Sequence, residues 1–152
     1  TEIWLRAIAA QPFPWLRHRI AHLARNWRIT LDGVPQDAVY AMSEPNPYGL
    51  RFTPNPLTRI VVGAAQAMAN SPFGRPVTWI VIALILVPLS GRLASRPIIR
   101  ALAASAILYG GAYALISVAP DLRYNLWTML AAMLASALAI GDLLSARRQA
   151  RR

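Results

Sequence analysis

Residues 77–91 read VTWIVIALILVPLSG, and two later stretches share this character: ALAASAILYGGAYALISVA at 101–119 and LWTMLAAMLASALAIG at 126–141. No Asp, Glu, Lys, Arg or His lies inside any of the three. About 20 apolar residues in a helix cross roughly 30 Å of hydrocarbon. The pattern therefore predicts an all-α membrane protein with three transmembrane helices.

The predicted transmembrane region covers residues 76–145. Its three spans are expected at about 76–91, 98–118 and 125–144. The second span contains Gly110-Gly111, which permits close helix contact. The third carries a face of small residues suited to packing on a neighbouring helix, namely Ala131, Ala132, Ala135, Ser136 and Ala139.

The composition favours the same class of protein. Of the 152 residues, 56% are hydrophobic and 14% are charged, against about 25% charged in ordinary soluble domains. The net charge is +10, and all sixteen basic residues are arginine. Because arginines flank the apolar stretches, where anionic head groups would lie, the lipid bilayer is the expected partner and nucleic acid is not. Cysteine is absent, which excludes disulfides and thiolate metal sites.

Residues 1–75 are predicted to form an extracytoplasmic, interfacial segment. Amphipathic or short apolar helices are expected at about 2–10, 14–28 and 56–69, with a proline-rich loop at 30–56 that must lie in water or at the interface. The helix at 14–28 is basic, with an apolar face that suits a membrane interface or, alternatively, docking on a soluble domain. That face consists of Trp15, Leu16, Ile20, Leu23, Ala24 and Trp27.

Arginine placement predicts the orientation. The link between the first two spans and the tail at 146–152 are both arginine-rich, and two spans separate them, so they share one side. The positive-inside rule makes that side cytoplasmic. We therefore expect a bacterial inner-membrane protein with a periplasmic N-terminal segment and a basic cytoplasmic tail. The arginines concerned are Arg92, Arg96, Arg100, Arg147, Arg148, Arg151 and Arg152.

The short periplasmic link before the third span holds the best candidate site. Asp121 can cap the helix or pair with Arg123, and the planar Arg123 guanidinium can bind a phosphate at the membrane surface. Tyr124 completes this group of lipid or phosphate contacts. The alternative is a structural role for all three residues, with Asp121 as a helix cap, Arg123 on a lipid phosphate and Tyr124 as an interfacial anchor. Five tryptophans are predicted interfacial anchors: Trp4, Trp15, Trp27, Trp79 and Trp127.

Other polar residues give weaker signals. His18 and His22 are spaced i, i+4, but a third ligand is missing, so no metal site and no cofactor are predicted. Asp142 lies near the cytoplasmic end of the third span and is expected to pair with Arg147 or with water. The loop acids, for which the sequence identifies no partner, are Asp32, Asp37 and Glu44.

Two stretches, QPFPWLRHRIAHL at 11–23 and DLRYNLW at 121–127, resemble the C-terminal portion of large bacterial inner-membrane proteins of the GT-C glycosyltransferase type. Those enzymes use polyprenyl-phosphate sugars. Gln11 and Trp15 stand where that group has His and Tyr. The resemblance implies a catalytic acid in an earlier loop that nothing here matches. It also implies that Arg123 and Tyr124 contact a lipid-linked phosphate.

The predicted function is therefore a non-catalytic C-terminal module of such a protein. This agrees with a start at Thr1-Glu2-Ile3, without an initiator Met or a signal-peptide pattern, which favours a piece of a longer protein. The alternative is a small accessory subunit of a larger photosynthetic or respiratory membrane complex, acting through helix packing and interfacial docking. Transport is a weaker reading, because the spans hold no internal charge.

Overall fold

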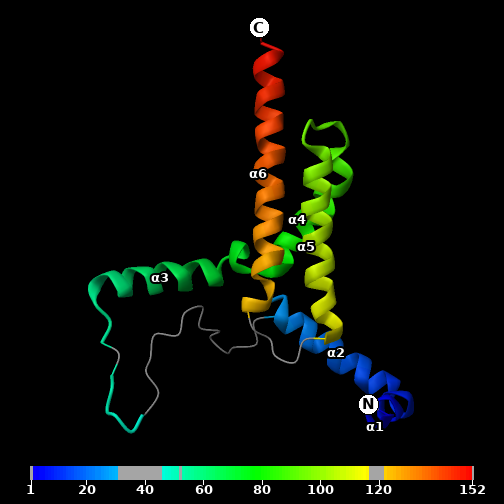
Figure 1. The fold of residues 1–152 in the computed structure, drawn as a ribbon, viewed down its shortest axis with the longest axis vertical. Helices are drawn as coiled ribbons and strands as arrows, with labels where there is room; N and C mark the ends of the chain where they lie inside the picture. Colours follow the sequence, from blue (N-terminus) through cyan, green and yellow to red (C-terminus); the bar gives the residue numbers. More distant parts are fainter. Residues whose placement is uncertain (1, 31–45, 52, 117–121, 152) are drawn as a thin grey trace. The chain divides into compact units, whose positions relative to one another are not determined.

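The computed structural model describes residues 2–30, 46–51, 53–116 and 122–151, and over these residues the chain is helical without strands (Figure 1). The predicted all-α class is confirmed to this extent. The α-helices are α1 (Glu2–Ala10), α2 (Pro12–Asn26), α3 (Pro56–Asn70), α4 (Pro76–Leu89), α5 (Arg96–Ile116) and α6 (Leu126–Gln149). Short 3₁₀ helices are η1 (Pro72–Gly74), η2 (Ser90–Arg92) and η3 (Leu122–Asn125).

The chain divides into two units. The larger combines α1 and α2 with α4, α5 and α6. The smaller contains α3 and η1. In the smaller unit, the Asn55 side chain caps α3 by accepting hydrogen bonds from the Thr58 amide at 2.8 Å and the Thr58 hydroxyl at 3.0 Å. Gly74 is packed so closely on the end of α3 that a Cβ would lie 2.5 Å from the Ala69 Cα, so no larger residue fits there.

In the larger unit, α4, α5 and α6 pack side by side as a bundle with a core of small residues (Figure 1). The predicted small face of α6 is buried: Ala131, Ala132 and Ala135 are fully enclosed, and Ala139 is 5% exposed. Alanines of the other two helices meet it, and Trp79 and Met129 add the bulk that fills this core. Small side chains let the helix backbones approach closely, so dispersion contacts run along the whole seam.

Among the described residues, α6 is the one helix that is long and apolar enough to cross a membrane, and Pro76–Arg92 is a shorter apolar helical stretch. The 24 residues of α6 rise about 36 Å at 1.5 Å per residue. Its apolar residues lie on all sides and not along one stripe. The structure thus shows the three-helix bundle, with one helix of membrane-spanning length and composition.

Several helix bounds differ from the expected ones, and three of these differences have a clear cause. α6 continues to Gln149, into the segment predicted as a tail, because arginines are good helix formers and are favoured near a helix C-terminus. α5 begins at Arg96, two residues early, because Asp142 binds Ser95 just before it. α2 begins at Pro12, since proline is tolerated in a first helical turn.

The C-terminus of α2 is closed by a Schellman motif that uses arginine in place of glycine. Arg28 has a φ of 53°, while its amide bonds the Arg25 carbonyl and the Ile29 amide bonds the Ala24 carbonyl, at 3.0 and 2.8 Å. Arg28 is also buried, at 3% exposure. The chain reversal exposes the Trp27 carbonyl, which accepts a bond from the Val77 amide at 3.2 Å. This bond joins α2 to the start of α4.

Candidate binding face at the α2 end of the bundle

α2 crosses the end of the bundle at which α5 finishes and α6 begins (Figure 1). Two buried amides hold it there. Asn125 donates through Nδ2 to the Asn26 side-chain oxygen at 2.7 Å and to the Asn26 carbonyl at 3.3 Å. The exposed fractions of the two residues are 0% and 2%. A buried amide that loses its partner costs about 1–3 kcal/mol, so this pair fixes the position of α2.

A second contact comes from the residue directly after Asn26. The Trp27 indole Nε1 donates to the Gly110 carbonyl at 3.2 Å. Gly110 is required by packing, because an added Cβ would lie 3.1 Å from both Ile80 Cδ1 and Thr128 Oγ1. By contrast, nothing lies within 4 Å of a Cβ placed on Gly111. The predicted close contact at the glycine pair is thus made by Gly110.

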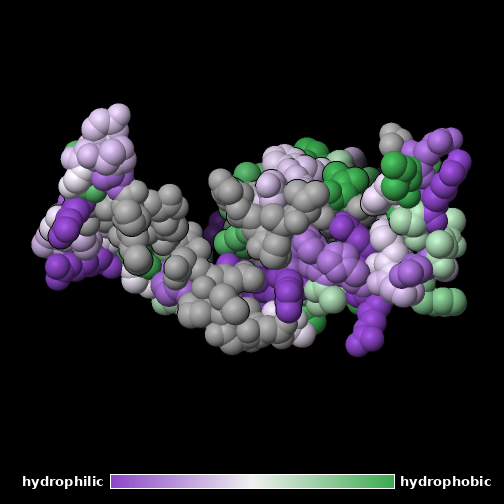
Figure 2. All heavy atoms as spheres, turned by 90° about the horizontal axis from the view of Figure 1, so that it is seen from below, coloured by the Kyte–Doolittle hydropathy of each residue, from purple (hydrophilic) through white to green (hydrophobic). Residues whose placement is uncertain are grey.

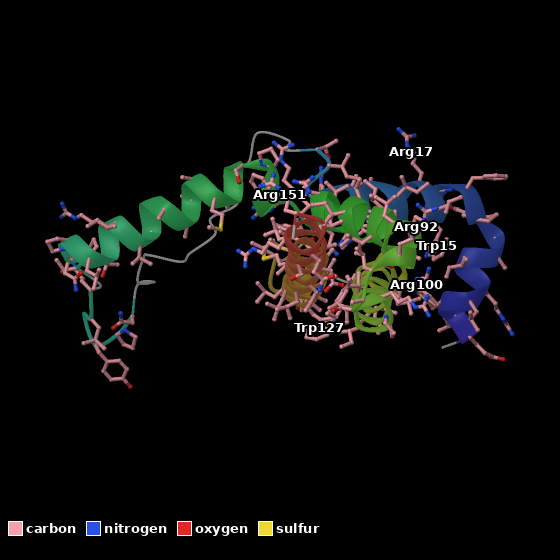
Figure 3. The ribbon with its side chains drawn as sticks, turned by 90° about the horizontal axis from the view of Figure 1, so that it is seen from above. Trp15, Arg17, Arg92, Arg100, Trp127 and Arg151 are labelled. Atoms are coloured by element: carbon pink, nitrogen blue, oxygen red, sulfur yellow. The ribbon has the colours of Figure 1, made fainter. Side chains whose placement is uncertain are left out.

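α2 docks through part of its predicted apolar face, since Trp15, Leu23, Ala24 and Trp27 are half-buried. Leu16 and Ile20 are 48% and 57% exposed, whereas Asn26 is buried and Arg19 and His22 are half-buried. In Figure 3, Trp15 lies on the side of α2 near the bundle and Arg17 points away from it. Hydrophilic and hydrophobic atoms lie side by side over α1 and α2 in Figure 2. The helix is attached by polar groups and by part of its apolar face, and it leaves other apolar side chains exposed.

Four aromatic side chains form a row along α5 and the start of α6, which we call the aromatic row. Its members are Tyr109, Tyr113, Tyr124 and Trp127. The Tyr109 and Tyr113 hydroxyls are 3.2 Å apart, and the rings meet edge to face at 5.2 Å. Tyr113 stacks on Tyr124 at 5.3 Å with an interplanar angle of 20°. The Trp127 indole donates to the Ser105 hydroxyl at 2.8 Å.

The predicted phosphate contacts fall at this same end. Asp121 lies outside the described residues. Arg123 belongs to η3, and its side chain is not described. Tyr124 is half-buried and directed onto Tyr113. The structure therefore brings Tyr124 into the aromatic row, with the Arg123 backbone next to it.

The five predicted anchors occupy three kinds of environment. Trp4 and Trp127 are 59% and 40% exposed, as a lipid-facing ring requires. Trp15 and Trp27 are half-buried beside the bundle end. Trp79 differs from the expectation, because it is 9% exposed and packs in the core, where its bulk fills the space beside alanines.

The other predicted polar residues are the two histidines of α2, Asp142 of α6 and the three loop acids. The rings of His18 and His22 are 6.2 Å apart between centroids, and the described ranges contain no cluster of three or more His, Cys, Asp or Glu able to hold a metal ion. Asp142 accepts hydrogen bonds from the Ser95 amide at 2.7 Å and hydroxyl at 3.1 Å. Its expected ion pair with Arg147 is not formed. The loop acids Asp32, Asp37 and Glu44 lie outside the described residues.

The aromatic row offers ring faces for stacking and phenol hydroxyls for hydrogen bonds, which is chemistry for binding. The i, i+4 spacing of Tyr109 and Tyr113 was visible in the sequence and was not used. The stacking of Tyr113 on Tyr124 and the Asn26–Asn125 pair connect positions 11 and 99 residues apart. No sequence signal predicts such pairs.

No family model matches this chain, and comparisons with curated proteins and with solved structures found no similar protein.

Proposed function

We propose that the chain is a membrane-embedded, non-catalytic module in which α4, α5 and α6 cross a bacterial inner membrane. In this proposal α1 and α2 lie at the periplasmic interface and the arginine-rich end faces the cytoplasm. The observation that carries the proposal is the distribution of side-chain size across the bundle. Alanines predominate among the enclosed residues, with Ile80 and Ile99 beside them, and many of the large aliphatic residues are exposed.

The exposed apolar residues are spread over all three helices of the bundle. On α6, Leu130, Leu134, Ile140 and Leu143 are 46–57% exposed. The other exposed aliphatic residues of the bundle helices include Val81, Leu84, Ile85, Leu89, Ile98, Leu108, Ile116, Leu126 and Leu144. Contiguous apolar surface of this extent is unfavourable in water. In a bilayer the same surface faces acyl chains, and helices associate through small residues.

The lengths of α5 and α6 and the arginine positions support the same placement, whereas the 14 residues of α4 rise only about 21 Å. α5 has 21 residues, which rise about 31 Å, close to the roughly 30 Å of a hydrocarbon core. The polar link between α4 and α5 and the end of α6 both carry arginines, so both suit the cytoplasmic head-group region. At the opposite end, α2 carries exposed Phe13, Leu16 and Ile20 for the lipid interface.

The more specific proposal is a C-terminal module of a GT-C-like glycosyltransferase that contacts a lipid-linked phosphate. It rests on the resemblance of residues 11–23 and 121–127 to those enzymes. It is supported by the aromatic row beside Arg123, since stacked phenols and a guanidinium would suit an isoprenoid phosphate carrying a sugar. Arg123 would bind the phosphate, Asp121 would orient Arg123, and Tyr124 would contact the ligand.

The second candidate is an accessory subunit of a larger bacterial membrane complex. The exposed apolar side chains of α1, namely Ile3, Trp4 and Leu5 at 55–86% exposure, favour it, because they would suit docking on a partner protein at the interface.

Alkaline carbonate extraction tests the common part of the proposal. Membranes from cells that express residues 1–152 are washed with carbonate, which strips peripheral proteins and leaves spanning helices in the pellet. We expect the chain to remain in the pellet. Release into the supernatant would contradict a spanning bundle.

The intact mass of the native polypeptide, purified in detergent with its companions, separates the two candidates. A mass several times 16.7 kDa would support a module of a polytopic enzyme. A mass near 16.7 kDa would contradict the glycosyltransferase module and leave an accessory subunit.

A further inference from the structure

Three exposed arginines surround the link between α4 and α5: Arg92 in η2, and Arg96 and Arg100 in the first two turns of α5. We call them the arginine triad. Figure 3 looks onto this end of the bundle and shows Arg92 close to Arg100. Arg100 Nη2 would lie 3.4 Å from a Cβ on Gly91, the residue preceding Arg92. Arg96 and Arg100, four residues apart, share one face of α5.

The geometry of the triad is set by other residues. Arg100 donates through Nε to the Val87 carbonyl at 3.2 Å, which restrains the guanidinium beside the link. Asp142 on α6 binds both the amide and the hydroxyl of Ser95, between Arg92 and Arg96 in the chain. We call this contact the Ser95–Asp142 latch. It ties the arginine-bearing link to α6.

The charge of the triad is not neutralised within the described part of the chain. Asp142 is the acid at this end, and both of its oxygens bond Ser95 and not an arginine. Arg92, Arg96 and Arg100 make no ion pair with any described residue. Three exposed guanidiniums around one short link, without a counter-charge among the described residues, attract a phosphate, which accepts paired hydrogen bonds from guanidinium groups.

We propose that the arginine triad, held in place by the Ser95–Asp142 latch, is a binding site for the phosphate of an anionic phospholipid head group. The inference rests on the proposed function, which places this end of the bundle in the head-group region. In this proposal the arrangement of the three arginines, and not only their positive charge, determines lipid binding. The exposed arginines at the end of α6 would contribute much less.

Lipid retention by the detergent-purified chain tests the site, with palmitoyl-oleoyl phosphatidylglycerol compared against phosphatidylcholine of the same chains. We expect preferential binding of phosphatidylglycerol and a loss of about tenfold in Arg92→Gln/Arg96→Gln, which leaves the structural bond of Arg100 intact. The matched control is Arg147→Gln/Arg148→Gln, which removes the same charge from the same end. We expect it to lose no more than about twofold. Equal losses in the two double variants would overturn the site.

Asp142→Ala separates geometry from charge, since it makes the protein more positive and breaks the latch. A fixed site predicts weaker phosphatidylglycerol binding in this variant, and simple attraction predicts stronger binding, which would overturn the proposal. In a second measurement, millimolar inorganic phosphate is added as a competitor of the bound lipid. Full displacement of the lipid by phosphate alone would mean a free anion is the ligand, and would overturn the lipid assignment.

Carbonate extraction of each variant keeps the two proposals distinguishable. A chain that remains in the membrane pellet but shows no preference for phosphatidylglycerol overturns the lipid site alone. A chain released from the membrane overturns the spanning bundle and the lipid site together.

Discussion

The two ends of the α4–α6 bundle are closed by different chemistry. At one end, α2 is held by neutral groups: an amide pair and an indole bonded to a carbonyl. At the other end, one carboxylate binds the link between α4 and α5 among exposed arginines. The first end is covered by the docked helix α2, which carries exposed arginines of its own, and the second end is tied by a single carboxylate. In the proposed spanning bundle, these two unlike ends would lie at opposite surfaces of the membrane.

The largest expected effect comes from the glycine pair at the α2 end. Gly110→Val forces side-chain atoms against Ile80 and Thr128, and overpacking of this kind costs about 1–3 kcal/mol, here near the upper value. Gly111→Val is the matched control, since the space beside it is open. Thermal unfolding in detergent, followed by circular dichroism, measures both. Equal losses of stability would mean that the bundle is not packed at Gly110 as described.

Removal of the buried amide pair comes next. Asn125→Ala leaves the Asn26 oxygen without its donor, at a cost of about 2 kcal/mol, and should loosen α2. Hydrogen exchange of residues 12–26 is the measurement, and faster exchange there than in α6 is expected. Gln11→Ala, at an exposed position without a side-chain cap bond, serves as the control. The Asn26→Ala/Asn125→Ala double variant should lose less than the sum of the two single variants.

The latch at the arginine end should contribute less. Asp142→Ala removes two hydrogen bonds before the first turn of α5, and loss of such a capping contact costs about 1 kcal/mol. Asp142→Asn keeps an acceptor and should retain part of the stability. Hydrogen exchange in residues 96–100 follows both variants. If exchange rises at the α2 end instead, the two ends are not independent.

The smallest effect is expected at the aromatic row. Trp127→Phe keeps an aromatic ring and removes the hydrogen bond to Ser105, which is worth about 0.5–1 kcal/mol at this exposed position. Ser105→Ala removes the same hydrogen bond by deleting the acceptor, and it should cause the same loss of stability as Trp127→Phe. Thermal unfolding of both variants is the measurement. If their midpoints differ by several degrees, the lost hydrogen bond does not explain both changes in stability.

The sequence predicted what depends on local pattern. The apolar stretches predicted helices, the small residues of α6 predicted its buried face, and α3 begins at residue 56 as expected. Contacts between distant segments could not be predicted. Asp142 was expected to meet Arg147 because opposite charges on one helix are visible in a sequence. Its partner Ser95 lies 47 residues away and becomes adjacent only when α5 packs on α6.

The candidate site was predicted in part for the same reason. Tyr124 was predicted as a contact in the link before the third span and Trp127 as an interfacial anchor, and both belong to the aromatic row. Tyr109 and Tyr113 join the row because of the way α5 is rotated about its axis. The spacing of apolar residues does not predict this rotation when most residues of the helix are apolar. Trp79 was assigned to an interface by residue type, whereas its burial depends on alanines in two other helices.

The most direct test of the central claim uses single cysteines, because the chain has no cysteine of its own. Arg17→Cys marks exposed α2, and Arg151→Cys marks the end just beyond α6. Intact bacterial spheroplasts are treated with a membrane-impermeant maleimide. The spanning bundle predicts labelling of Arg17→Cys in intact spheroplasts and of Arg151→Cys only after lysis. Labelling of both positions before lysis, or of neither, would contradict it.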